Sequence, residues 1–324
     1  MIKVKMRKAI LDLGTNVFNM LLCEFTPQGE CRTIKEYKCA AKLGGGGLAD
    51  GLIAPVAYET ATAALEKIME QIELAGGADE IIPYATSAVR DAKNGAEFAE
   101  YLNRKFGFRV RIIPGEREAE LIFKGIMESV QGLRGADGKF ATGENALMLD
   151  IGGGSNEFII TNGAEILWKK SFPIGMARMR EKFAYEDPIP QEVAQEFIRF
   201  NEEVLVELWE MVEKYGPRIF IGSSGSFDTF KDLIFNCGYR ELPSIELAME
   251  DLKKLDDTLV ASVASERLHM PGMSPIRVDY IVLASIFSRY VLEKLQPRIV
   301  YQSSFSLKEG GMKEEFDKYL NSKI

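Results

Sequence analysis

Apolar residues in the first forty positions alternate and cluster as they do in β-strands. One apolar run ends at Asp12, a turn of small residues follows at 14–16, and a second run covers 17–25. A short segment with proline and glycine then leads into a third run with strand character. Runs of this length bounded by turn residues are typical of strands. The pattern predicts three consecutive strands, with an Asp-x-Gly loop between the first two.

The same succession returns one domain length further along the chain. An apolar run ends at Asp150, Gly-Gly-Gly-Ser follows at 152–155, and another strand leads to an Asn162-Gly163 dipeptide. Asn-Gly between apolar runs is a strong signal of a hairpin. Asp12 and Asp150 lie 138 residues apart. The chain therefore contains two copies of one strand–loop–strand–turn–strand unit.

Helical spacing follows each copy and alternates with further strands. The first half is expected to form helices over 55–75, 94–106 and 115–130 and strands over 81–86 and 108–113. The second half is expected to form helices over 175–185, 190–214, 247–257, 261–268 and 275–295, strands over 218–221 and 298–301, and a last helix over 306–321. A polar, glycine-rich linker at 131–144 separates the halves. This order predicts an α/β fold.

Composition narrows the class of protein. The length of 324 residues corresponds to about two domains, and 46% apolar with 27% charged residues excludes a disordered chain. A net charge of −8 argues against a general nucleic-acid binder. No apolar run reaches the roughly 18 residues of a membrane span, and the first residues lack a secretory signal. We expect a cytoplasmic protein that contacts no membrane, with reduced thiols at Cys23, Cys31, Cys39 and Cys237.

The single histidine, His269, restricts the chemistry. A histidine-rich metal site cannot be built, so any metal must be a hard cation on oxygen ligands. Acid–base catalysis must come mainly from carboxylates, lysine or tyrosine. His269 precedes Met-Pro-Gly and is expected to be a loop residue beside a turn.

The two glycine-rich turns favour phosphate as a ligand. Without side chains in the way, backbone N–H groups can converge on an anion. A carboxylate facing phosphate would repel it, so Asp12 and Asp150 imply a bridging divalent cation, most simply Mg²⁺, which Glu157 could join. The plain alternative is that the glycines are hairpin turns and the aspartates turn caps. That alternative is favoured for the glycines at 44–47, which no aspartate precedes.

Six ordered segments resemble the exopolyphosphatase/guanosine pentaphosphate phosphohydrolase (Ppx/GppA) family of the actin-like superfamily. They are DLGTNVFNMLL (12–22), YATSAVRDAKNG (84–95), IIPGEREAELIFKGI (112–126), LDIGGGSNEF (149–158), IGSSGSFDTF (221–230) and SSFSLKEGGM (303–312). The resemblance implies two actin-like (ribonuclease H-like) α/β domains, 1–130 and 131–305, with the active site in the cleft between them. It also implies that 306–324 returns to the first domain, that the chain is a short form without an HD domain, and that a homodimer is plausible.

The resemblance also assigns roles to individual residues. Glu118 matches the family's catalytic glutamate, which activates the attacking water, and Arg90 matches an arginine that binds phosphate. The acidic positions around Mg²⁺, or another divalent cation such as Mn²⁺, correspond to Asp12, Asp150 and Glu157. The phosphate loops correspond to Gly14, Thr15, Asn16, Gly152, Gly153, Gly154, Ser155, Ser224 and Gly225. The activity implied is release of terminal phosphate from polyphosphate, guanosine pentaphosphate, or both.

Departures from the family pattern keep other functions open. Val17, Asn156 and Phe305 replace a serine, a threonine and a glycine of the usual motifs, and Lys308 replaces an arginine. These changes motivate a catalytically weak protein that binds polyphosphate or guanosine tetra- or pentaphosphate. A kinase of the wider superfamily is a third possibility. The cations expected near a polyphosphate groove are Arg90, Lys93, Arg117, Lys124, Arg267 and Lys308.

Overall fold

A computed structural model describes residues 5–45, 47, 51–235 and 242–322. The chain forms two compact units. The first contains the residues up to Gly125 and those from Ser306 onward, and the second runs from Ile126 to Phe305. The chain therefore leaves the first unit inside one helix and returns to it for its last helix.

The first unit is built on a five-stranded sheet of order β3-β2-β1-β4-β5. β1 to β3 are antiparallel neighbours, while β4 runs parallel to β1 and β5 parallel to β4. The strands are β1 (Met6–Leu13), β2 (Val17–Phe25), β3 (Cys31–Ala40), β4 (Glu80–Ala85) and β5 (Arg111–Ile112). The helices are α1 (Pro55–Leu74), α2 (Ser87–Arg90), α3 (Gly95–Phe106), α4 (Gly115–Ser129) and α12 (Leu307–Asn321).

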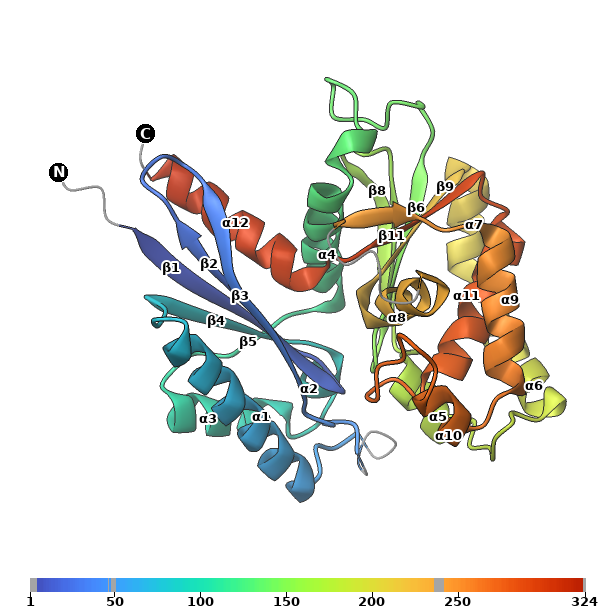
Figure 1. The fold of residues 1–324 in the computed structure, drawn as a ribbon, viewed down its shortest axis with the longest axis horizontal. Coiled ribbons are helices and arrows are strands. Elements are labelled where there is room, and N and C mark those ends of the chain that lie inside the picture. The colour runs from blue at the N-terminus through green and yellow to red at the C-terminus, as the bar shows by residue number, and fades with distance from the viewer. Residues whose placement is uncertain (1–4, 46, 48–50, 236–241, 323–324) are drawn as a thin grey trace. The chain divides into compact units, whose positions relative to one another are not determined.

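Helices cover both faces of this sheet (Figure 1). On one face, Phe25 of β2 packs its ring 5.1 Å from that of Phe316 and 5.3 Å from that of Tyr319, both in α12. The other face carries α1 and α3, which are joined through Tyr58 and Phe98 with ring centroids 4.9 Å apart. The C-terminal helix thus completes the core of the first unit.

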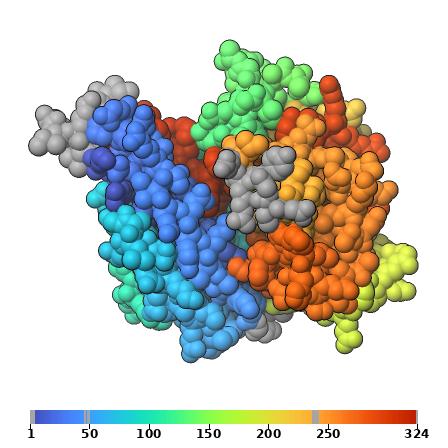
Figure 2. Space-filling model, viewed as in Figure 1, coloured from blue at the N-terminus to red at the C-terminus, as the bar shows by residue number. Residues whose placement is uncertain are grey.

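The β3 edge of this sheet is exposed. Residues 31–34 of β3 are all exposed, and they belong to the blue surface of the first unit (Figure 2). The strand carries several lysine, arginine and glutamate side chains. Charges on an edge strand disfavour pairing with another chain.

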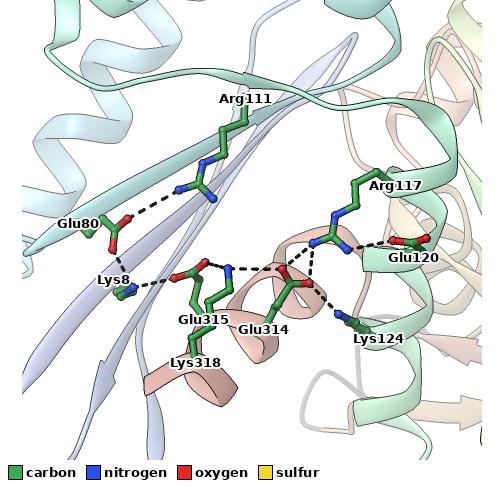
Figure 3. Close-up of polar contacts among 9 residues, drawn as sticks. All are labelled: Lys8, Glu80, Arg111, Arg117, Glu120, Lys124, Glu314, Glu315 and Lys318. Atoms are coloured by element: carbon green, nitrogen blue, oxygen red, sulfur yellow. Dashed lines mark hydrogen bonds and ion pairs between the residues drawn. The ribbon is translucent and has the colours of Figure 1, made fainter. Parts of the chain in front are cut away.

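An ion-pair network joins α12 to α4 and to the sheet (Figure 3). Glu314 accepts hydrogen bonds from Arg117 at 2.6 Å and from Lys124 at 2.7 Å, both on α4. On the sheet side, Lys8 donates to Glu315 at 2.7 Å. The helix backbones also approach closely, since a Cβ at Gly310 would lie 1.7 Å from the Leu121 carbonyl oxygen. This network fixes the helix that carries Glu118.

The pH dependence of stability tests this network. Burial alone favours the neutral acid, but hydrogen bonds from Arg117 and Lys124 lower the pKa of Glu314 to about 2. A lowered carboxyl pKa contributes stability above the ordinary value of 4.5 and loses it as pH falls toward 2. Glu314→Gln should therefore lower the free energy of unfolding at pH 7 by about 1–2 kcal/mol, between exposed and buried ion pairs. The difference from the parent should shrink below about pH 4.5.

Urea unfolding between pH 7 and pH 3 measures this difference. Glu100→Gln is the control, because Glu100 forms an exposed pair with Arg104 in the same unit. Its effect should stay within about 0.5 kcal/mol at every pH. Equal stabilities of the Glu314→Gln variant and the parent at pH 7 would contradict a stabilising role for the network.

The second unit is built on a six-stranded sheet of order β10-β11-β9-β6-β7-β8. Its strands are β6 (Ala146–Ile151), β7 (Asn156–Thr161), β8 (Ile166–Phe172), β9 (Ile219–Ser223), β10 (Ser244–Glu246) and β11 (Ile299–Ser303). Its helices are α5 (Met176–Lys182), α6 (Gln191–Val204), α7 (Val206–Tyr215), α8 (Ser224–Phe235), α9 (Met249–Ala261), α10 (Ala264–Leu268) and α11 (Ile281–Leu295), with a 3₁₀ turn, η1 (Gln131–Leu133). The strands confirm the repeat, because β6-β7-β8 form an antiparallel meander like β1-β2-β3. A parallel strand also pairs with the first strand of each meander, β4 with β1 and β9 with β6.

The core of the second unit centres on α11, a helix that is almost entirely buried. It packs against α5, α6 and α9, and its Phe287 lies 6.2 Å from the ring of Phe158 in β7. A helix that is apolar on all sides belongs inside a domain. Within the described ranges, no helix combines the length and apolar character that crossing a bilayer requires.

Three of the predicted elements differ most from the structure. The helix expected over 190–214 is two helices that meet at Leu205, a buried residue in the same apolar periodicity, so no sequence pattern marks the break. β5 pairs over two residues only, because the chain soon leaves the sheet edge to enter α4. Residues 274–280 form consecutive turns, and α11 begins at Ile281.

Several smaller expectations concern single residues and the linker. His269 follows α10 as an exposed residue, as expected, and its Nδ1 lies 2.7 Å from the Ser265 carbonyl oxygen. Cys23, Cys31 and Cys39 are reduced thiols outside any disulfide, and Cys237 lies outside the described residues. The 131–144 linker is not a spacer but part of the second unit, where Phe140 N–H donates to the Asn162 carbonyl.

Candidate phosphate site

The first loop begins where β1 ends. Asp12 lies directly opposite Asn19 of β2, and the Asn19 amide donates to the Asp12 carboxylate at 2.9 Å. The loop needs glycine at position 14, because a Cβ there would lie 2.9 Å from the Val17 carbonyl oxygen. Thr15 and Asn16 are buried. The hairpin thus holds one carboxylate beside a tight, largely buried turn.

Backbone hydrogen bonds orient the peptide groups of this loop. The Thr15 carbonyl accepts from Gly44 N–H at 3.2 Å, and the Asn16 carbonyl accepts from Ala41 N–H at 2.9 Å. In a trans peptide the N–H points opposite to the C=O. The N–H groups of Asn16 and Val17 therefore face away from the segment after β3. The glycines at 44–47 support the loop through Gly44, and Gly46 lies outside the described residues.

Arg90 and Glu118 meet in the first unit. Arg90 ends α2, and its Nη1 donates to Glu118 Oε2 in the first turn of α4 at 2.6 Å. Arg90 Nη1 also lies 3.3 Å from the Ile113 carbonyl oxygen, and its Nε donates to Asp91 at 3.2 Å. The Glu118 side chain is 9% exposed. The arginine therefore holds an almost buried carboxylate in one orientation.

Two buried carboxylates face each other in the second unit. Asp150 of β6 lies directly opposite Glu157 of β7. Glu157 Oε1 accepts from the hydroxyls of Ser155 at 2.7 Å and Ser171 at 2.6 Å. Ser223 at the end of β9 lies 3.3 Å from Asp150 Oδ2. Two neighbouring oxygen ligands of this kind are suited to a hard divalent cation.

The pair of carboxylates suits a Mg²⁺ ion that keeps waters and phosphate oxygens as further ligands, rather than a metal ion coordinated by protein side chains alone. No group of three or more His, Cys, Asp or Glu side chains in the described ranges is arranged to hold a metal. Mg²⁺ is usually bound by one or two carboxylates together with waters and substrate phosphates. Asp150 and Glu157 supply that number from the second unit, while Asp12 belongs to the first.

The second loop is held by the start of α5. The carbonyl oxygens of Gly152 and Gly153 accept from Met176 and Ala177 N–H, each at 2.9 Å. The Gly154 carbonyl accepts from Gly175 N–H at 3.3 Å. Because each carbonyl faces α5, the following N–H groups, those of Gly153, Gly154 and Ser155, point to the opposite side. Successive N–H groups with a common direction form an anion-binding nest.

A third loop follows β9 and begins α8. Ser224 has a φ of +68°, and its hydroxyl donates to the Ile151 carbonyl at 2.8 Å. A serine with this backbone conformation is uncommon and often marks a functional loop. A Cβ at Gly225 would lie 1.9 Å from Nη2 of Arg277, so this guanidinium occupies the space that a side chain would take. The loop therefore carries a guanidinium against its backbone.

Sequence reasoning missed several polar residues at these loops: Asn19, Ser171, Arg178, Ser223 and Arg277. The repeat could have indicated Asn19, which is the counterpart of Glu157 at the same offset of 138 residues. Arg178 donates from Nε to the Gly154 carbonyl at 3.1 Å. No local pattern connects Arg178 or Arg277 with its loop.

The prediction that Arg267 lies near a polyphosphate groove is wrong. Arg267 is 1% exposed, and its guanidinium donates to Asp187 at 2.6 Å inside the second unit, so it cannot line a groove. Three other expected cations, Arg117, Lys124 and Lys308, are held in ion pairs with glutamates of the first unit. Their positive charges stabilise the fold around α12.

Known proteins resemble this chain in sequence and in fold. The profile of the Ppx/GppA phosphatase family matches residues 26–319. The chain belongs to this family. An exopolyphosphatase from Cytophaga hutchinsonii is 32% identical, with a TM-score of 0.88 over 96% of this chain and 98% of its own. The Ppx/GppA family member from Aquifex aeolicus is 23% identical, with a TM-score of 0.76 over 99% of this chain and all of its own.

Membership of the Ppx/GppA family identifies the chain as a phosphatase, an enzyme of the hydrolase class. The predicted fold class is confirmed, since the α/β structure with two mixed sheets matches actin-like Ppx/GppA proteins of similar size. In this Ppx/GppA chain, two of the loops expected to bind phosphate follow the first strand of each repeat, and the third follows β9.

Proposed function

We propose that the protein releases terminal phosphate from inorganic polyphosphate, guanosine pentaphosphate, or both. The observation that carries this proposal is the backbone of the second loop, whose three glycine carbonyls accept hydrogen bonds from the first residues of α5 or from Gly175, the residue before it. The loop's N–H groups face the other way and suit a phosphate group. The 32% identical relative is an exopolyphosphatase, which supports a phosphoric anhydride as substrate.

Positioning and charge neutralisation can supply most of the catalysis. Phosphoryl transfer needs little covalent chemistry from a protein, because charge on the transferred group must mainly be held and neutralised. The loops of Gly14, Thr15 and Asn16, of Gly152–Ser155, and of Ser224 and Gly225 are proposed to bind phosphate. Arg90 is proposed to hold a phosphate oxygen while it orients Glu118.

Glu118 is proposed as the general base. A carboxylate can accept the proton of the attacking water if it is fixed within hydrogen-bond reach. The 2.6 Å bond from Arg90 holds the buried Glu118 side chain in one orientation. In a chain with one exposed histidine, a carboxylate is the natural group for this role.

Asp150 and Glu157 are proposed to hold Mg²⁺ or Mn²⁺, with Asp12 as a further acidic group. A bound divalent cation would neutralise phosphate charge during transfer. Ser155 and Ser171 orient Glu157 through its Oε1, and Ser223 lies against Asp150. Hydroxyl partners of this kind fix the direction of ligand oxygens.

Phosphate release from the two substrates tests the proposal. We expect release from polyphosphate or guanosine pentaphosphate with Mg²⁺ present, and loss of most activity with a chelator and no added metal. Restored activity on adding Mg²⁺ or Mn²⁺ is the control for irreversible damage. Tight binding of either substrate without turnover would instead favour the binding protein. ADP formed from ATP only with an acceptor would favour the kinase.

One departure from the family motifs is compatible with an active enzyme. Asn156 is fully buried, and its Nδ2 donates to the Ile174 carbonyl at 3.1 Å. Ile174 precedes Gly175, which packs on the backbone of the second loop. The asparagine therefore supports the loop and weighs against the idea that this substitution disables it.

A further inference from the structure

A cavity of about 360 Å³ lies among three helices of the second unit. Its wall is formed by α8, α9 and α11, and α9 packs against both of the other helices (Figure 1). The apolar side chains of the wall are Phe230, Met249, Leu252, Leu255 and Leu292. Phe230 and Leu292 are buried, whereas Met249 is exposed at the surface. A cavity of this volume with mainly apolar walls is typical of sites for small organic molecules.

The hydroxyl groups in the α11 wall are acceptors for a ligand. Ser285 and Ser288 are both buried in the wall. Ser285 donates its hydroxyl hydrogen to the Val282 carbonyl at 2.9 Å, and Ser288 donates to the Ala284 carbonyl at 2.7 Å. Each hydroxyl has one hydrogen to donate but two lone pairs that can accept. The wall therefore favours a ligand that donates hydrogen bonds over one that only accepts them.

Negative charge is in excess at the Arg289 end of the cavity. The guanidinium of Arg289 is shared by three carboxylates. Its Nη1 donates to Asp256 at 3.0 Å and to Asp257 at 2.7 Å, and its Nε donates to Glu293 at 2.9 Å. Arg289 and Glu293 belong to the wall itself. One positive charge cannot balance three negative ones, so this end of the cavity attracts a cation.

Asp256 is the buried member of this group. The residue is 4% exposed, and its carboxyl lies beside Ser285 and Arg289, two residues of the wall. Oδ2 accepts from Arg289, whereas no described residue donates to Oδ1. Burial raises the pKa of Asp256, because the charged form loses its contact with water. An additional positive charge nearby would stabilise the carboxylate.

We propose that this cavity binds a small organic cation with an apolar body, such as an arylalkyl ammonium ion. The apolar body lies among the leucine side chains, and the ammonium group lies at the end where the carboxylates share Arg289. Glu250 and Lys253, the other charged residues of the wall, have opposite signs and leave the preference for a cation unchanged. The inference does not depend on the proposed phosphatase function, because its test measures binding at a different set of residues.

Calorimetric titration of the full chain with tryptamine tests the proposal. Tryptophol and indolepropionate are the matched probes, because they carry the same indole with a neutral or a negative group. At about pH 7.5 tryptamine is a cation, and we expect it to bind with a Kd below about 1 mM. Tryptophol should bind about 10-fold more weakly and indolepropionate more weakly still, because each lacks the ion pair. Equal affinity for tryptamine and tryptophol, or no binding of tryptamine, would overturn the proposal.

Asp256→Asn removes the buried charge and keeps the shape of the side chain. It should weaken tryptamine binding by about 10-fold, as expected for a lost interaction between charged groups. The affinity for tryptophol should stay within about twofold. Asp251→Asn is the matched control, because it removes one carboxylate from the same helix at a position outside the cavity wall. Equal tryptamine affinities in the two variants would contradict the assigned position of the ammonium group.

Ser288→Leu tests the cavity without changing a charge. Ser288 lies in the wall and its hydroxyl is bonded to its own helix, so leucine there fills part of the cavity. The variant should weaken tryptamine binding by at least about 10-fold. It should also keep or raise the temperature of thermal unfolding, because filling a cavity commonly stabilises a protein. A folded Ser288→Leu variant that binds tryptamine as the parent does would place the binding elsewhere and overturn the proposal.

Discussion

Replacing Glu118 with glutamine is expected to lower the rate of phosphate release by about 10²- to 10⁴-fold, the range that general-base catalysis contributes. Glutamine has nearly the same shape but cannot accept the proton of the attacking water. The hydrogen bond from Arg90 can still form to the amide oxygen, so the side chain should keep its place. Substrate binding should therefore change much less than the turnover number.

Steady-state phosphate release measures the turnover number, and tripolyphosphate binding measures the affinity for substrate. Glu116→Gln is the control, because Glu116 is exposed in the same turn of α4. It should keep activity within about twofold, as a surface substitution does. Full turnover in the Glu118→Gln variant would remove this residue from the mechanism. The phosphatase class, which the family establishes, would then require another base.

Replacing Gly175 with alanine is expected to damage the second loop. A Cβ at this position would lie 2.4 Å from the backbone C of Gly153 and the backbone N of Gly154. The backbone at Gly175, with φ −65° and ψ 155°, is open to any residue, so the effect comes from the clash alone. The backbone atoms of Gly153 and Gly154 cannot move aside without moving the loop's N–H groups.

The expected result is a loss of about 10- to 100-fold in kcat/KM for polyphosphate, equivalent to the 1–3 kcal/mol typical of overpacking. Gly132→Ala is the control, since a Cβ there meets no atom within 4 Å in the same unit. Both variants should be compared by phosphate release and by thermal unfolding. A Gly175→Ala variant with full activity would show that the position of this loop does not matter for turnover.

Local signals account for most of the fold. β2 runs over Val17–Phe25, as predicted, and α1, α3, α4 and α12 begin and end within a residue of the predicted bounds. Glycines, prolines and apolar periodicity act between near neighbours, so they can be read from the chain. Leu205 shows the limit, because the break between α6 and α7 leaves the apolar spacing intact.

The roles of the cations could not be read in this way. Arg117 and Lys124 stand beside family motifs, yet their partner is Glu314, about 190 residues further along the chain. Arg267 stands beside the lone histidine and is buried with Asp187. A charge in a sequence does not reveal its partner, because packing decides which oppositely charged group lies within reach.

The sequence by itself determined the twofold repeat, the α/β class, the family resemblance and a chemistry that depends on carboxylates. Only the tertiary structure decided which way the peptide groups of the loops face. The carbonyls of Gly152 and Gly153 are bonded to α5, more than twenty residues later, and Arg178 reaches Gly154 from the same helix. Glycine allows many backbone conformations, so a glycine-rich stretch specifies none of them. Contacts with a distant segment select one.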